Sequence, residues 1–338
     1  MNTAPLLTYV LAGQLQRNYI LLNDGKPLLD VPGGGLLYSA AGLGVWDTGA
    51  GLLARVGEDF PQIWLEQTAR RGFDCHGIHI LPESIDLRNF IAYNEEGVAQ
   101  RENPVSHFAR LGLPFPKALL EYNNNLAQLD SRIRLTPLSL RLNDLPAYFL
   151  DATAAHLGPL DYVSHSLLPP TLRQGHISVI TIDPSPGYMN PTYWNDIPAL
   201  LTGITAFHVS EQKIRSLFQG RSENLWEMAE TLAGYGCEII TILRGLQGQY
   251  IYDGASHTRW TLPAYPAHVV DPTGNDDAYC GGFLAGYHKT YDALQAAFYG
   301  NISASFKVEG SNVFYALDTL PGLAEARMFA LKELARKA

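Results

Sequence analysis

The segment Val269–Phe283 constrains the fold of this chain more than any other, because it predicts a strand end, a tight turn and a helix start. Apolar β-branched residues up to Val270 are typical of a strand, and Pro272 and Gly274 favour a turn. Small and aromatic residues then continue at helical spacing to Tyr287. The helix start is either a cradle for an anion beside a carboxylate base, as phosphoryl transfer to an alcohol requires, or simply an acidic, well-capped helix end.

Short apolar stretches alternate with helix-like stretches along the rest of the chain. Strands are expected at Leu6–Ala12, Leu52–Val56, Ile78–Leu81, Tyr162–His165, Ile177–Ile182, Ala206–Val209, Ile239–Leu243 and Tyr250–Tyr252. Helices are expected to close at Gly42–Trp46 and to span Phe60–Arg71, Glu211–Phe218, Glu223–Tyr235 and Ala324–Lys337. This order predicts an α/β fold with a mainly parallel central sheet and helices on both faces. The segment Gly97–Pro146 is the least regular, which suggests an insertion or helices over one edge.

Composition narrows the class of protein. The chain has 338 residues, 46% hydrophobic and 17% charged, with a net charge of -9, which describes a globular protein with a large core. The acidic balance and the lack of a Lys/Arg run argue against nucleic acid and anionic membranes as partners, and no apolar run has the length of a membrane span. Three widely spaced cysteines favour a reducing, cytoplasmic compartment over a disulfide framework.

A second glycine-rich stretch, Pro32–Ala41, lies near the N-terminus. Glycines allow backbone to approach a ligand or a neighbouring helix closely. No Gly-Lys-Ser/Thr follows, so the stretch is not a Walker P-loop, and the spacing of a dinucleotide fingerprint is absent. A turn that serves only tight packing is the alternative.

These two stretches together resemble the signatures of the ribokinase-like (PfkB) sugar kinases. The C-terminal signature, D-T/P-x-G-A-G-D-x-F, is matched at Asp271, Thr273, Gly274 and Asp277. The resemblance assigns the catalytic base to Asp277 and the anion hole to Gly274, Asn275 and Asp276. Asp276 replaces a glycine of that anion hole.

The N-terminal part of the resemblance implies the substrate site. Asn18, Gly34, Gly35 and Tyr38 fall at substrate-binding positions, with Asn18 in place of the family's Asp and Tyr38 in place of its Asn. An Asn still accepts one hydrogen bond and donates another. The resemblance covers residues 1–338 as one kinase domain, with a small β-strand lid at about residues 14–32 and 84–102. It also implies that two copies of the chain could form a homodimer through this lid.

The remaining motifs imply ATP and Mg²⁺. Thr273, Arg244, Gly245, Gly248 and Asn301 match positions that surround the nucleotide. Glu211 and Asp276 are the candidate magnesium ligands. In the region that organises magnesium, Ser210 replaces Asn and Lys213 replaces Glu.

The resemblance implies an ATP-dependent phosphotransferase that acts on a hydroxyl of a sugar, a nucleoside or a similar small alcohol. The alternative is a catalytically weak ligand-binding or regulatory protein on the same fold. A carboxylate at Asp276 about 5 Å from a phosphate costs roughly 3 kcal/mol at an effective dielectric near 20. Its side chain therefore points away, or holds magnesium, or the site no longer transfers phosphate. We expect repulsion relieved by an outward rotamer.

Overall fold

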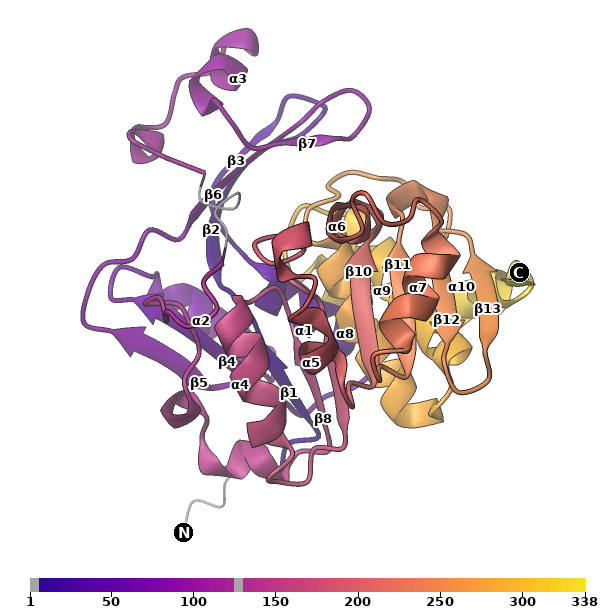
Figure 1. Cartoon of the computed structure of the whole chain (residues 1–338). Coiled ribbons are helices and arrows are strands. Elements are labelled where there is room, and N and C mark those ends of the chain that lie inside the picture. Colours follow the sequence, from indigo (N-terminus) through magenta and orange to yellow (C-terminus); the bar gives the residue numbers. More distant parts are fainter. Residues whose placement is uncertain (1–5, 125–129) are drawn as a thin grey trace.

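The protein consists of a large sheet covered by helices and a small sheet that projects from it (Figure 1). The computed structural model describes residues 6–124 and 130–338. The large sheet has the strand order β14-β13-β12-β11-β10-β9-β8-β1-β4-β5. Its strands are β1 (Tyr9–Ala12), β4 (Ala50–Gly57), β5 (Asp74–Leu81), β8 (Ala154–Leu157), β9 (Val179–Ile182), β10 (Ala206–Ser210), β11 (Ile239–Leu243), β12 (Gln249–Asp253), β13 (Thr258–Leu262) and β14 (Arg336–Lys337).

Seven neighbouring strands, from β11 to β5, run parallel, and β12 to β14 continue the sheet antiparallel. Every residue of the central strands β1, β4, β8, β9 and β11 is buried, as expected for parallel strands covered on both faces. The α/β class, the mainly parallel sheet and the helices on both faces are confirmed.

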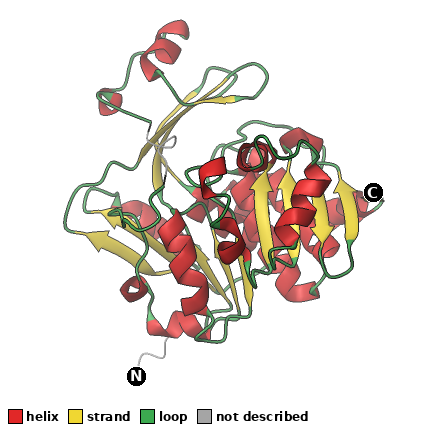
Figure 2. Cartoon of the chain, in the orientation of Figure 1, coloured by secondary structure: helices red, strands yellow, loops and turns green. Residues whose placement is uncertain are grey.

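Helices form a layer on each face of this sheet (Figure 2). One layer contains α4 (Tyr162–Leu172), α5 (Ile197–Leu201), α6 (Glu211–Leu217) and α7 (Leu225–Ala233). The apolar side chains of these helices form one core cluster with residues of strands β8 to β11. The opposite layer contains α1 (Gly35–Gly44), α2 (Gln62–Arg70), α8 (Asn275–Thr290), α9 (Ala293–Val308) and α10 (Leu323–Lys332). No helix within the described ranges is long and apolar enough to cross a bilayer.

The small sheet has the order β3-β2-β6-β7 and carries α3 (Pro104–Arg110) at its far end (Figure 1). Its strands are β2 (Gln16–Leu21), β3 (Pro27–Gly33), β6 (Arg88–Tyr93) and β7 (Ala99–Gln100). They coincide with the two segments expected to form a lid, except that β3 extends one residue further, to Gly33 beside the N-terminus of α1. Their function as a lid stays a prediction.

Two strand predictions are wrong. Tyr162–His165 begins helix α4, because Asp161 accepts a hydrogen bond from the Ser164 N–H and so caps a helix there. The strand of this region is β8 (Ala154–Leu157), which precedes α4 in the chain. Val269 and Val270 lie exposed in a loop rather than at a strand end, because the Val270 N–H donates to the Val308 carbonyl at the end of α9 instead of to a neighbouring strand.

Candidate active site

The N-terminus of α8 is an open cluster of backbone donors. Gly274, the N-cap, has φ 76°, a left-handed conformation that glycine adopts without strain. The Asn275 N–H donates to the Pro272 carbonyl. The N–H groups of Asp276 and Asp277 have no acceptor among the residues that the structure describes. Together with the helix dipole, two free N–H groups of this kind are suited to bind an anion.

The two glycine-rich stretches meet at this helix start. A Cβ atom added at Gly274 would collide with the Tyr38 ring, so the turn and the side chain lie in direct contact. A Cβ atom added at Gly35 would lie 2.5 Å from Asp277 Oδ1. Gly34 has φ 100° and is the N-cap of α1, so the N-termini of α1 and α8 lie side by side. The glycines therefore bring Asp277 against the backbone of the first motif.

Asp277 is the most chemically poised group of the cluster. Its Oδ1 atom is buried and has no hydrogen-bond partner in the described part of the chain. Burial raises the pKa of Asp277 to about 7, Asp183 adds to this rise, and the Lys213 ammonium opposes it. A carboxylate with an unused oxygen and a pKa near neutrality is suited to accept a proton from a hydroxyl.

A buried charge cluster lies beside Asp277. Asp183 follows the C-terminal end of β9, and its Oδ1 accepts a hydrogen bond of 2.6 Å from Lys213 Nζ. Burial lowers the pKa of Lys213, but Asp183, Asp276 and Asp277 outweigh burial and leave it raised. Burial also raises the pKa of Asp276, against the effect of Lys213, and Asn275 donates to Asp276 Oδ1 at 3.3 Å. The Asp276 carboxylate thus interacts with this cluster.

A row of polar side chains leads from Tyr38 into the small sheet. Asn18 is fully buried and donates to the Tyr38 hydroxyl at 3.2 Å. Asn89 donates to Asn18 Oδ1 at 3.1 Å and accepts from Arg101 Nη1 at 3.0 Å. Arg101 also lowers the pKa of Asp277, against the larger effect of burial.

A second connection runs from the small sheet to the helix start. The Tyr93 hydroxyl at the end of β6 and Thr273 Oγ1 share a hydrogen bond of 2.9 Å. The site therefore combines a carboxylate able to act as a base, free backbone donors, a buried ammonium and amide side chains able to bind hydroxyl groups. This is the set of groups that transfer of a phosphoryl group to an alcohol requires.

Comparison with known proteins agrees with this chemistry. Residues 179–320 match the model of the pfkB family carbohydrate kinases. Residues 179–320 thus carry a pfkB family carbohydrate kinase domain. The chain is 25% identical over 293 residues, which cover 84% of this chain and 90% of the relative, to a protein named cytidine kinase from Thermococcus kodakarensis. These similarities support a kinase of the sugar or nucleoside class.

Solved structures place the fold in the ribokinase family. A putative ribokinase II from E. coli in its apo form matches with a TM-score of 0.71 and 17% identity, covering 96% of this chain and 100% of that one. The same protein in complex with ATP and Mg²⁺ matches with a TM-score of 0.70 and 16% identity over the same shares. At these identities the likeness describes the fold alone.

Three of the predicted nucleotide positions, Arg244, Gly245 and Gly248, lie together after the end of β11. Arg244 follows β11, and its guanidinium donates to Glu211 and lies 4.5 Å from the centre of the Tyr250 ring. Gly245 and Gly248 flank a short turn, with φ 55° and 82°. Both glycines use backbone conformations that other residues rarely adopt.

Asn301, the remaining nucleotide candidate, is engaged within the protein. Its Oδ1 accepts from the Tyr265 N–H at 2.9 Å, and its Nδ2 donates to the Pro263 carbonyl at 2.8 Å and to Gln249 Oε1 at 3.3 Å. The side chain therefore holds the loop after β13 against α9. Any contribution to a nucleotide site comes through this loop.

Glu211 does not fit the expected magnesium ligand. Its Oε1 accepts from Arg215 and its Oε2 from Arg244, so both oxygens are neutralised by guanidinium groups. Within residues 6–124 and 130–338 no group of three or more His, Cys, Asp or Glu side chains is arranged to hold a metal ion. Lys213 instead brings a positive charge next to Asp276 and Asp277. A charge pair of Lys213 and Asp183 therefore lies beside Asp276, the other candidate magnesium ligand.

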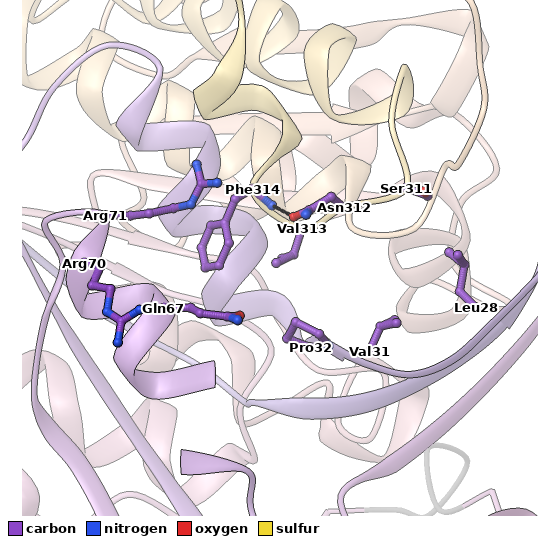
Figure 3. A pocket seen from close by; sticks show the side chains of 10 residues that line it. All are labelled: Leu28, Val31, Pro32, Gln67, Arg70, Arg71, Ser311, Asn312, Val313 and Phe314. Atoms are coloured by element: carbon purple, nitrogen blue, oxygen red, sulfur yellow. Dashed lines mark hydrogen bonds between the residues drawn. The ribbon is translucent and has the colours of Figure 1, made fainter. Parts of the chain in front are cut away.

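A separate cavity of about 590 Å³ lies away from these residues (Figure 3). It opens between strand β3, helix α2 and the loop after α9. Two arginines line it, but Arg70 is paired with Glu66, and Arg71 is paired with Asp318 and lies 5.1 Å from the centre of the Phe314 ring. None of the predicted catalytic residues reaches it.

Several residues of the site were not predicted. Asn89, Tyr93 and Arg101 lie within the expected lid strands, where alternation of polar and apolar residues marks the strands but not which polar residue faces the site. Asp183 was also missed, although it directly follows a predicted strand. An acidic residue at the C-terminal end of a parallel strand is the signal that points to it, because ligands bind at that edge of such sheets.

Proposed function

We propose that this chain is an ATP-dependent phosphotransferase that acts on a hydroxyl of a nucleoside or a sugar. The observation that carries the proposal is the Asp277 carboxylate in the first turn of α8, whose buried Oδ1 lies against Gly35 and has no hydrogen-bond partner among the described residues. The similarity to a cytidine kinase over most of both chains favours a nucleoside as acceptor. A cytoplasmic location and a homodimer through the small sheet belong to the same proposal.

In the proposed reaction Asp277 acts as the general base. It accepts the proton of the acceptor hydroxyl as that oxygen forms a bond to phosphorus and the bond to the leaving phosphate oxygen breaks. ATP, when bound, supplies the transferred phosphoryl group. A base matched to the pH of the reaction contributes roughly 10²–10⁴-fold to the rate.

The N-terminus of α8 and Lys213 would stabilise the negative charge that develops during transfer. The free N–H groups of Asp276 and Asp277 point out of the helix start, and the Lys213 ammonium lies within their charge cluster. Preorganised donors of this kind act without reorganisation during the reaction. The charge that Asp276 adds is offset by Lys213, which supports an active site at this position despite the lost glycine.

The small sheet would bind the acceptor. Asn18 and Asn89 present amide groups that both donate and accept, as two neighbouring hydroxyls require. Arg101 holds Asn89, and Tyr93 links the sheet to Thr273 in the turn before α8. Closure of this sheet would exclude water from the base.

Magnesium enters the proposal only with the nucleotide. The described side chains do not form a cage for the ion, and Glu211 is engaged by Arg215 and Arg244. The ATP and Mg²⁺ present in the E. coli relative's structure support a metal–nucleotide complex as the phosphoryl donor. We therefore assign no step to a protein-held metal.

The proposal is tested by calorimetry with ATP and Mg²⁺, followed by an ADP-release screen over nucleosides and sugars. We expect nucleotide binding at submillimolar to millimolar concentration, and ADP release that depends on one class of acceptor. Nucleotide or nucleoside binding without turnover for any acceptor would favour the alternative, a catalytically weak binding or regulatory protein. The pairing of the Glu211 carboxylate with Arg215 and Arg244 is the observation that favours this alternative.

A further inference from the structure

Lys307, near the end of α9, holds a fully buried ammonium group. Its side chain is 1% exposed. Its Nζ donates to two backbone carbonyls, those of Asp271 at 3.1 Å and Gly310 at 3.0 Å, and lies 3.4 Å from Asp271 Oδ2. Burial lowers the pKa of Lys307, and Asp271 opposes that change. These two carbonyls and the carboxylate form a site for a dehydrated cation. The cation that fills the site is the ammonium group of Lys307, which is covalently attached to the chain.

This cation lies directly behind the turn that forms the anion-binding site. Asp271 accepts from the Thr273 N–H through Oδ1 at 2.9 Å while its Oδ2 faces Lys307. The Lys307 Nζ is also 5.4 Å from the centre of the Tyr38 ring, which packs on Gly274. The Lys307 ammonium therefore interacts both with Asp271, in the turn before α8, and with the Tyr38 ring, which packs on Gly274 in the same turn.

The same turn is tied to the end of α9 by backbone. The Val308 carbonyl accepts from the N–H groups of Val270 at 2.7 Å and Asp271 at 3.0 Å. Removing the ammonium would leave the Asp271 carboxylate buried and unneutralised within this turn. An uncompensated buried charge is costly, so the turn would rearrange, and the free donors at the start of α8 would move with it.

We propose that Lys307 is a positioning residue that acts as a tethered monovalent cation. Its ammonium neutralises Asp271 and fixes the turn 271–274, which sets the free N–H groups of α8 for phosphate. The proposal rests on the proposed phosphotransferase function for its effect on nucleotide, but the cation site itself does not depend on it. Because potassium and ammonium ions are close in size to a lysine ammonium, either ion is expected to fill the site when the side chain is shortened.

The test compares Lys307→Ala, Lys307→Met and Lys289→Ala with the wild type. The alanine variant opens space for a free ion, whereas the methionine variant fills that space without a charge. Lys289 is a matched control, since its Nζ donates to the Trp46 carbonyl and lies 3.5 Å from Asp47, but it is partly exposed. Thermal unfolding without nucleotide and the dissociation constant of ATP are measured in potassium, ammonium, lithium and tetramethylammonium chloride at equal ionic strength.

We expect Lys307→Ala to lower Tm by roughly 5–10 °C and ATP affinity at least about tenfold in tetramethylammonium chloride. Potassium or ammonium should restore most of both losses, and lithium should restore less. Lys307→Met should stay impaired in every salt, and the wild type and Lys289→Ala should not distinguish the ions. If Lys307→Ala does not fold, Lys307→Met still decides the role of the charge.

Two results would overturn the inference. One is a Lys307→Ala variant that responds to potassium no more than Lys289→Ala does. The other is a Lys307→Met variant that binds ATP and unfolds like the wild type, which would reduce Lys307 to a packing residue. If the wild type binds no ATP, the proposed function fails, while the ion-specific recovery of Tm still tests the cation site.

Discussion

Replacing Asp277 by Asn removes the proposed base while keeping the size and the position of the side chain. An amide cannot accept the hydroxyl proton, so we expect kcat to fall by roughly 10²–10⁴-fold. The affinity for ATP should change little, because the backbone donors of the helix start remain. The pKa of about 7 also predicts a pH profile for the wild type. About one-tenth of Asp277 is ionised at pH 6, so kcat/KM should be about tenfold lower there than at pH 8.

The same substitution should stabilise the fold. The folded protein holds the Asp277 proton up to about pH 7, whereas the unfolded chain releases it near 3.8. The free energy of unfolding of the wild type therefore falls as the pH rises through this window. Raising the pKa of Asp277 from 3.8 to about 7 corresponds to at most about 4 kcal/mol of unfolding free energy. Because the residue is partly exposed, we expect the measured loss of unfolding free energy to be about 2 kcal/mol. Asp277→Asn should be more stable than the wild type at pH 8 and similar to it at pH 4.

Chemical denaturation at both pH values and the ADP-release assay measure the two effects on the same preparations. Asp276→Asn is the matched control, since burial raises the pKa of Asp276 as well. It should gain stability at pH 8 and keep activity within about tenfold. Turnover by Asp277→Asn within threefold of the wild type, or a pH profile that is flat between 6 and 8, would refute the assignment of the base.

Three further substitutions test the surroundings of the base. Gly35→Ala places a Cβ atom about 2.5 Å from Asp277 Oδ1, so kcat should fall at least about a hundredfold. The control Gly234→Ala, in ordinary helical backbone, should leave kcat unchanged. Equal kcat for the two variants would contradict the packing of Asp277 on Gly35. Lys213→Gln removes the ammonium that lowers the pKa of Asp277, so the acid limb of the kcat/KM profile should move to higher pH, and an unmoved limb would remove Lys213 from the site. Asp276→Gly removes a charge that raises the pKa of Asp277, so the limb should move to lower pH and ATP should bind more tightly; a new requirement for magnesium would instead identify Asp276 as a metal ligand.

The architecture was largely predictable because it depends on local patterns. Buried strands such as β4 and β11 are largely apolar, with one polar residue each (Arg55 and Thr241), and glycines stand where two helices begin. Strand β8 was not predicted, since Ala154, Ala155 and His156 are weak strand formers. His156 is accommodated because its Nδ1 pairs with Thr181 Oγ1 on the neighbouring strand at 2.9 Å. Such a partner is visible only once the strand order is known.

The site was predictable where one short segment carries several groups. The turn and helix start at 271–277 were identified as a unit, and the structure brings them against Gly35 and Tyr38. The contacts of Glu211 were not predictable, because Arg244 comes from the end of another strand. The effect of Lys213, whose ammonium lowers the pKa of Asp276, was not predictable either, and the outward rotamer of Asp276 stays a prediction. Pairing between distant segments decides both cases.

The most direct measurement is the mass of the product formed from ATP, Mg²⁺ and a panel of nucleosides and sugars. We expect the wild type to add one phosphate to a nucleoside or sugar with stoichiometric formation of ADP, and Asp277→Asn, bound to the same nucleotide, to form no such product. ATP binding with no phosphorylated acceptor anywhere in the panel, or equal product from both proteins, would contradict the proposed function.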